Sequence, residues 1–218
     1  MIGTLMHPTA DDSDLTRVSI APPGERVRVH PWTFAVLEIA HELNALTAGV
    51  FDPCLPGKPG RLTDLDLTIR DHVGRGAPLA IDLGGIAKGF AVDRAIDTLQ
   101  AHGCSAGLVN AGGDVRVFGA IARPIVVRLP TGGVAQIELA NAALAVSGPK
   151  SIGSPQEHCG YYLGSTRESV VGRTIAITAA EAVIADALTK CAMLCPAATA
   201  EFVLRKYGAR RVEITSAA

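Results

Sequence analysis

Apolar side chains recur every three to four residues in several stretches of the sequence, which is the spacing of one face of an α-helix. In the first stretch Phe34, Leu37, Ile39 and Leu43 recur at near-helical spacing, Pro31 suits the first helical turn and Gly49 suits the helix end. We therefore expect a helix over residues 32–47. The same pattern predicts helices over residues 86–102, 181–194 and 197–206.

Shorter apolar runs, bounded by glycine and polar turn residues, predict strands. A glycine-rich turn at residues 131–133 lies between two of these runs and indicates a hairpin. We expect loop with one short strand over residues 1–30, a long loop from residue 51 through residue 60, and an irregular loop over residues 148–172. The predicted strands are 78–82, which would be buried, 106–110, 115–118, 124–129, 134–139, 143–147, 173–178 and 210–215.

Hairpins that alternate with helices indicate an α+β fold, with mixed, largely antiparallel sheets packed against helices. A chain of 218 residues fits one domain or two interleaved halves. Hydrophobic residues make up 48% of it, so a large core is expected, and the 4% of aromatic residues make that core aliphatic. The net charge of −1 argues against a nucleic-acid partner, because a protein that binds phosphate backbones normally has a basic excess.

The sequence also bears on location and on metals. Five cysteines without a CxxC pair indicate free thiols in a reducing compartment, and we interpret Cys191 and Cys195, one helical turn apart, as helix packing rather than metal ligands. Residues 1–14 do not have the basic and apolar regions of a signal peptide, and no apolar run approaches the ~20 residues of a membrane span. We expect a cytoplasmic protein without a membrane segment, although a trimmed start would also remove a signal.

The densest candidate chemistry lies at residues 81–89, which read IDLGGIAKG. Asp82 ends an apolar run, two glycines follow, and Lys88 stands in the first turn of the predicted helix. Such a strand-to-helix junction suits a nucleotide, because helix N-termini attract phosphate and glycine lets a ligand approach the backbone. The spacing matches neither a Walker A loop nor the GxGxxG fingerprint, so the two common nucleotide-binding folds are disfavoured.

Each candidate also has a plain structural interpretation. Asp82 can cap the turn that follows it, and Lys88 can be a solvated lysine, although Gly85 and Gly89 beside it favour a ligand contact because they have no evident packing purpose. Asp186, with Thr189 one turn away, can form half of a Mg²⁺ site. The alternative for Asp186 is a surface ion pair with Lys190, which we favour on these residues alone. Residues 110–114, NAGGD, read by themselves as a polar turn.

Three segments, in this order, resemble the FAD:protein FMN transferase family, also called the ApbE or thiamine biosynthesis lipoprotein family. They are IDLGGIAKG at 81–89, VNAGGD at 109–114 and ADALTK at 185–190. SDLTR at 13–17 and TAGVFDP at 47–53 fit the same order. The resemblance covers most of the chain from about residue 13. It implies one flavin transferase domain over residues 1–218, shortened at the N-terminus, with FAD in a cleft between two halves of an α+β fold.

Members of this family use Mg²⁺ to move FMN from FAD onto a threonine or serine of an acceptor protein, and AMP is released. The resemblance implies FAD as substrate, Mg²⁺ as cofactor and a flavin-acceptor protein as partner. Asp186 and Lys88 would be catalytic. The implied FAD contacts are Val50, Phe51, Asp52, Asp82 and Lys88, and the implied metal ligands are Gly85 through its carbonyl, Asp186 and Thr189.

Three departures from the family pattern bear on activity. The usual first strand, with its Met-Gly-Thr segment, is missing ahead of residue 13, and the sheet edge it leaves uncovered would favour a homodimer. A histidine followed by Asp-Pro-Arg-Thr-Gly is replaced by YYLGSTRE at residues 161–168, and His158 is the nearest histidine. Lys190 stands where a metal-binding threonine is usual, and its ammonium could repel the cation or replace part of its charge.

We therefore expect a Mg²⁺-dependent transferase that moves FMN to a protein. Two alternatives stay open: an FAD pyrophosphatase that uses water as nucleophile, and a non-catalytic FAD-binding relic of the family. A role in thiamine synthesis or metal trafficking has no support in these residues.

Overall fold

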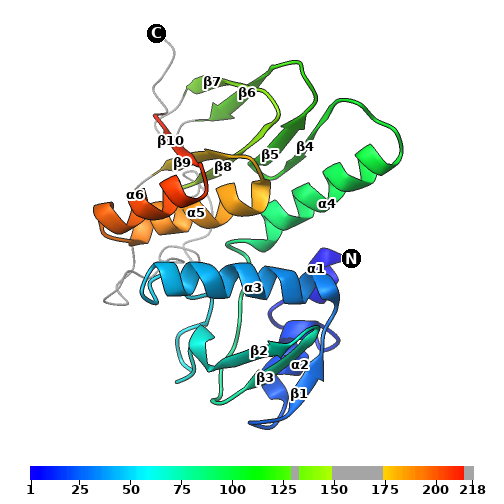
Figure 1. Cartoon of the computed structure of the whole chain (residues 1–218), viewed down its shortest axis with the longest axis vertical. Coiled ribbons are helices and arrows are strands. Elements are labelled where there is room, and N and C mark those ends of the chain that lie inside the picture. The colour runs from blue at the N-terminus through cyan, green and yellow to red at the C-terminus, as the bar shows by residue number, and fades with distance from the viewer. Residues whose placement is uncertain (129–132, 149–173, 214–218) are drawn as a thin grey trace. The chain divides into compact units, whose positions relative to one another are not determined.

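The computed structural model describes residues 1–128, 133–148 and 174–213 of the chain (Figure 1). The chain divides into two compact units, Met1–Ala87 and Lys88–Ala218. Each unit combines helices with antiparallel sheet, which confirms the predicted α+β class. The predicted loop over residues 148–172 and the first two residues of the predicted turn at 131–133 lie outside the described residues, apart from Gly148.

The first unit contains a three-stranded antiparallel sheet with strand order β1-β3-β2. Its helix α3 confirms the predicted helix: His30 caps it by accepting a hydrogen bond from the Trp32 amide, and Phe34, Leu37 and Leu43 are buried. In chain order the elements are α1 (Ile2–Leu5), α2 (Asp14–Ile20), β1 (Arg26–Arg28), α3 (Pro31–Leu46), the 3₁₀ turn η1 (Leu62–Asp64), β2 (Leu65–Ile69) and β3 (His72–Arg75).

The prediction of loop and one short strand over residues 1–30 is wrong for α1 and α2. Helix α2 begins after Ser13, whose hydroxyl accepts a hydrogen bond from the Thr16 amide, and it buries Leu15 and Val18, three residues apart. The polar residues taken for a turn therefore contain a helix cap. The short strand, β1, is present.

Two further differences concern the segment after α3. The hairpin of β2 and β3 was missed, although its turn carries the positive φ of 59° at Asp71 that such turns favour. The predicted strand 78–82 is instead an extended segment that forms one isolated bridge, between Cys54 and Ile81. Two backbone hydrogen bonds flank the bridge, from Leu55 to Ala80 and from Asp82 to Pro53. The prolines around it have no amide proton with which to extend a ladder.

The second unit contains a five-stranded antiparallel sheet with strand order β10-β9-β8-β5-β4, and a separate two-stranded sheet of β6 and β7. Helix α5 packs on β8 and β9 and against α6 (Figure 1). Within the described residues, the predicted strands and helices of this region are confirmed with shifts of a few residues at their ends, while residues 129, 173 and 214–215 of the predicted strands lie outside the description. The elements are α4 (Ala87–Ala101), β4 (Gly107–Ala111), β5 (Asp114–Phe118), β6 (Arg123–Arg128), β7 (Val134–Leu139), β8 (Ala142–Ser147), β9 (Ile175–Ala179), α5 (Ala182–Leu194), α6 (Ala197–Lys206) and β10 (Arg210–Val212).

One core cluster of the second unit is aliphatic, in keeping with the few aromatic residues of the chain. Val115, Val117 and Leu144 of the five-stranded sheet pack with Ile125 and Val127 of β6. Strands β4 and β5 are joined by a two-residue turn at Gly112 and Gly113, whose φ angles are 67° and 103°. Two successive positive φ angles define the tight hairpin turn that glycine adopts without strain, and this turn places Asp114 at the first position of β5.

In the part of the chain that the structure describes, no helix combines the length and the apolar character that crossing a membrane requires.

Candidate functional site

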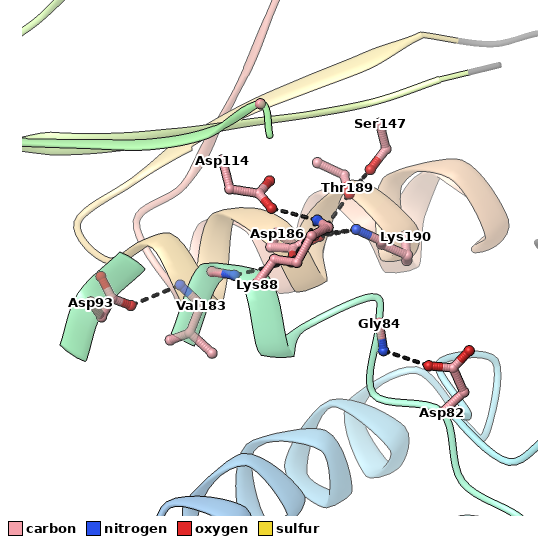
Figure 2. Close-up of polar contacts among 12 residues, drawn as sticks. Asp82, Gly84, Lys88, Asp93, Asp114, Ser147, Val183, Asp186, Thr189 and Lys190 are labelled. Carbon is pink, nitrogen blue, oxygen red and sulfur yellow. Dashed lines mark hydrogen bonds and ion pairs between the residues drawn. The ribbon is translucent and has the colours of Figure 1, made fainter. Parts of the chain in front are cut away.

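Helix α5 carries a buried polar cluster. Asp186 and Thr189 are fully buried, and Lys190 is only 5% exposed. Charged side chains are almost never buried to this degree unless they are paired, so the partners of these residues define the cluster (Figure 2).

The start of α5 is held by a carboxylate from another helix. The two oxygens of Asp93, on α4, accept hydrogen bonds from the amides of Ala182 at 2.9 Å and Val183 at 2.8 Å. Arg116 of β5 donates to the same carboxylate at 2.6 Å. Glu181, the residue at the cap position of α5, makes no side-chain cap of its own. Asp93 therefore supplies the cap and fixes α4, α5 and β5 relative to one another.

Gly89 is required by the packing of α4 on α5. A Cβ atom at this position would lie 2.2 Å from the carbonyl oxygen of Ala182 and 2.8 Å from the Cα of Val183. The premise that this glycine has no packing purpose, which favoured a ligand contact for Lys88, is therefore wrong. The close approach also brings the Gly89 amide to a carboxylate oxygen of Asp186, at 3.2 Å.

Both carboxylate oxygens of Asp186 accept hydrogen bonds (Figure 2). The ammonium of Lys190, four residues along the helix, contacts Oδ1 and also donates to the Asp186 backbone carbonyl at 3.1 Å. Oδ2 accepts from Gly89 and from Lys88, whose Nζ lies 3.4 Å away. The ion pair of Asp186 and Lys190 considered above is thus present, but it is buried rather than on the surface.

Lys88 bridges two carboxylates. Its Nζ pairs with Asp114 Oδ2 as well as with Asp186, while its side chain stays 50% exposed. Burial opposes the charge on Lys88, but the attraction of Asp186 and Asp114 outweighs it and raises the pKa of the ammonium. The pKa of Asp114 is raised by burial and by the charge of Asp186, against the pull of Lys88. Lys88 is therefore not the solvated lysine of the plain interpretation.

Thr189 lies in a short chain of hydroxyl groups. Its Oγ1 donates to the Asp186 carbonyl at 2.6 Å and lies 2.7 Å from the hydroxyl of Ser147, the last residue of β8. A hydroxyl has one proton to donate, so Ser147 is the donor to Thr189. The Thr189 hydroxyl is therefore held near the end of β8 by hydrogen bonds to both the Ser147 hydroxyl and the Asp186 carbonyl.

The remaining predicted residues belong to the first unit. Asp82 accepts a hydrogen bond from the Gly84 amide at 2.8 Å, which confirms its capping role. Phe51 is fixed through its backbone, because its carbonyl accepts from Asn44 at 2.8 Å and its amide donates to Thr47 at 2.9 Å.

Three more predicted residues lie in this unit. Asp52 accepts from the Cys54 amide at 2.9 Å and pairs with Arg61 at 3.8 Å. Val50 and Gly85 are partly buried. The structure thus brings Lys88, Asp186 and Thr189 together in the second unit, while the roles of all these residues toward FAD or a metal stay predictions.

Sequence reasoning missed three members of the cluster: Asp93, Asp114 and Ser147. Asp114 is 2% exposed and pairs with Lys88, although its segment was read as a polar turn. Its presence in VNAGGD, one of the segments that carry the family resemblance, was the available signal. Asp93 lay at the end of the glycine-rich stretch, and no local pattern marks Ser147.

The family model described as "ApbE family" matches residues 60–212, which include every residue of the buried cluster. The chain belongs to the ApbE family. No curated protein matches the sequence.

ApbE structures share the fold. The flavinyl transferase ApbE of Pseudomonas stutzeri, in its apo form, aligns with a TM-score of 0.78 at 18% identity, over 96% of this chain and 77% of that one. The flavin transferase ApbE of Vibrio cholerae gives 0.75 at 21% identity, over 96% and 79% of the two chains. The ApbE protein of Thermotoga maritima gives 0.66 at 25% identity, over 93% and 75%.

The Mg²⁺ ion that the family resemblance implies does not fit Asp186 as the residues stand. A cation would have to displace an ammonium from a carboxylate whose two oxygens already accept hydrogen bonds. Thr189 donates its proton within the protein and accepts from Ser147. Within the described ranges, no group of three or more His, Cys, Asp or Glu side chains is arranged to hold a metal.

Proposed function

We propose that this ApbE family protein is an FAD:protein FMN transferase, which moves FMN from FAD to a threonine or serine of an acceptor protein and releases AMP. Membership of the family supports the proposal, and so does the fold it shares with two proteins described as flavin or flavinyl transferases. FAD is then the substrate, and a protein that presents a hydroxyl side chain is the partner.

The half-exposed side chain of Lys88, whose ammonium is paired with two carboxylates, is the observation that carries the proposal. An ammonium has three N–H donors, and the contacts with Asp114 and Asp186 use two of them. The third can donate to a phosphate oxygen of FAD on the exposed side. Because two buried carboxylates orient the group and keep it charged, it is ready to stabilise negative charge that develops on a pyrophosphate.

The reaction balances as a phosphoryl-group transfer. The acceptor hydroxyl oxygen attacks the phosphorus attached to FMN and forms a new P–O bond. The bond from that phosphorus to the oxygen bridging the two phosphates breaks, AMP leaves with the electron pair, and the hydroxyl proton is released. Lys88 offsets the charge that accumulates on the phosphate oxygens, and Asp186 acts by positioning Lys88.

Several finer assignments remain predictions. Val50, Phe51, Asp52 and Asp82 are proposed FAD contacts. Gly85, Asp186 and Thr189 remain the Mg²⁺ ligands that the sequence predicts, although the contacts of Asp186 oppose them. The cytoplasmic location, the homodimer and the single-domain organisation likewise rest on the sequence.

The proposal is tested by neutralising Lys88. Lys88→Gln removes one positive charge and keeps a side chain of similar reach. Lys58→Gln, the control, removes one positive charge from an exposed loop position. We expect Lys88→Gln to slow FAD cleavage by about 10²–10³-fold, the usual effect of losing one charge-stabilising group, and Lys58→Gln to leave it unchanged. Chromatography of AMP and FMN, with a pool of threonine- and serine-containing peptides as acceptors, measures both rates.

Folding of Lys88→Gln is checked by circular dichroism, and binding of FAD by fluorescence quenching. If a folded Lys88→Gln protein releases AMP at the wild-type rate, Lys88 is not the phosphate contact. FMN that is set free, without any flavin-modified peptide, would indicate the pyrophosphatase alternative. Retention of FAD without any release of AMP would indicate the other alternative, a non-catalytic FAD-binding protein.

A further inference from the structure

A lysine occupies the position next to Asp186 that a cation would need. Lys190 lies on the same helix and is 5% exposed, and its ammonium contacts both Oδ1 and the backbone carbonyl of Asp186. With Lys88 on Oδ2, the carboxylate has one ammonium against each oxygen.

Among the described residues, the four that these ion pairs link carry charges that balance. Asp114 and Asp186 carry two negative charges, and Lys88 and Lys190 carry two positive ones, so these four sum to zero. Mg²⁺ binds carboxylate oxygens at about 2.0–2.1 Å and demands a nearly ideal octahedral shell. At that distance from Oδ1 it would lie beside the Lys190 ammonium, where repulsion in a buried site is strong.

Lys190 cannot easily move aside to admit an ion. Its side chain is buried, and moving away from Asp186 would break a buried ion pair, which is unfavourable. The second contact, with the Asp186 carbonyl one turn back, holds the ammonium in place.

We propose that Lys190 replaces a divalent cation as the counter-charge of Asp186, so that this protein does not bind Mg²⁺ at Asp186. Lys190 is then a positioning residue: it fixes the Asp186 carboxylate, which orients Lys88 toward a phosphate. If the proposed function holds, on which this consequence rests, the FAD-cleaving step needs no divalent ion at Asp186.

The test measures metal binding directly, so it does not depend on turnover. Mn²⁺, whose free form has a strong paramagnetic resonance signal, is titrated into wild-type protein and into the Asp186→Asn, Lys190→Thr and Lys206→Thr variants, with and without FAD. Lys206 is an exposed lysine of α6 and serves as the control. We expect wild type, Asp186→Asn and Lys206→Thr to bind Mn²⁺ equally weakly.

Lys190→Thr supplies a hydroxyl in place of the ammonium, and we expect it to bind one Mn²⁺ at least about tenfold more tightly than wild type, the lower range for changes beside a metal ligand. Adding Asp186→Asn to Lys190→Thr should abolish that gain. A tight Mn²⁺ site in the wild-type protein that Asp186→Asn removes would overturn the proposal, whether or not Lys190→Thr folds. So would a folded Lys190→Thr protein without any gain in affinity.

Turnover is scored separately, by comparing AMP release in EDTA with release in Mg²⁺. AMP in EDTA supports both proposals. An absence of AMP under every condition, with acceptor peptides present, counts against the transferase function alone, because the Mn²⁺ titration still decides the role of Lys190.

Discussion

At the scale of single residues, the cluster on α5 is a network of mutually compensating ion pairs. Asp186, Lys190, Lys88 and Asp114 are linked by ion pairs, and three of the four are buried. Breaking a buried pair by removing one partner costs about 3–5 kcal/mol, because the other charge is left without compensation. These residues therefore contribute to the unfolding free energy as well as to the proposed chemistry, and tests on them need a folding control.

Asp93, which caps α5, has a purely structural role. Asp93→Ala removes the carboxylate that accepts from two amides at the start of α5 and from Arg116. We expect the unfolding free energy to fall by about 2–4 kcal/mol. Asp97→Ala, on the same helix, breaks only a largely exposed pair with Arg94 and should change it by less than about 1 kcal/mol. Urea denaturation measures both, and equal effects would contradict the capping role.

The thiols allow a second residue-scale prediction. Burial raises the pKa of the Cys54 thiol, and the pKa of Cys191 is raised by its hydrogen bond to Cys195 and by burial. The same hydrogen bond lowers the pKa of Cys195, which is partly exposed. Because the thiolate is the reactive form, iodoacetamide near pH 8 should label Cys195 and the exposed Cys104 before Cys54 and Cys191. Peptide mass spectrometry with increasing time checks this order, and early labelling of Cys54 would contradict it.

At the scale of elements, the contact of α4 with α5 depends on one missing side chain. Gly89→Ala places a methyl group 2.2 Å from the Ala182 carbonyl, so the helices must separate or strain. We expect a loss of about 2–3 kcal/mol of unfolding free energy, the upper part of the usual range for overpacking, despite the better helix propensity of alanine. Gly3→Ala, in helix α1 with nothing within 4 Å of the added atom, should be neutral or slightly stabilising. Thermal melts of the two variants give the comparison, and a neutral Gly89→Ala would contradict the close approach.

The elements also show what the sequence could predict. Helices α3, α4, α5 and α6 follow from apolar spacing and end within two residues of their predicted limits, because periodicity and caps are local signals. The strand predicted at 78–82 is wrong for a long-range reason. An apolar run predicts burial, but a β-ladder also needs a partner segment with free amides. The prolines near the Cys54–Ile81 bridge have no amide proton, so the ladder does not extend. The β2–β3 hairpin was missed although the residues of β2, LDLTI, alternate between apolar and polar.

The candidate site was less predictable than the elements. Asp186 and Lys88 were found from motif and resemblance, and the pairing of Asp186 with Lys190 from helical spacing. The bridge from Lys88 to Asp114 joins residues 26 positions apart, and the contact with Asp186 spans 98. Such pairs depend on how α4, β5 and α5 pack, which no local pattern encodes. The ion pair of Asp186 with Lys190 is buried rather than on the surface, and this burial also follows only from the packing of α5 on β8 and β9.

At the scale of the whole molecule, family membership and fold agree with a flavin transferase, while the cluster on α5 departs from the metal-dependent form that the resemblance implies. FMN transfer and dependence on a divalent ion are therefore separate questions. Transfer of FMN rests on the family, the fold and the exposed side of Lys88. Independence from a divalent ion at Asp186 rests on Lys190.

The most direct test of the central claim is a mass balance on FAD. Protein, FAD and a pool of threonine- and serine-containing peptides are incubated together, and AMP, free FMN and peptide-bound flavin are each quantified by chromatography and mass spectrometry. Transfer predicts that AMP exceeds free FMN by the amount of flavin found on peptides. AMP equal to free FMN, or FAD left intact, would contradict the account.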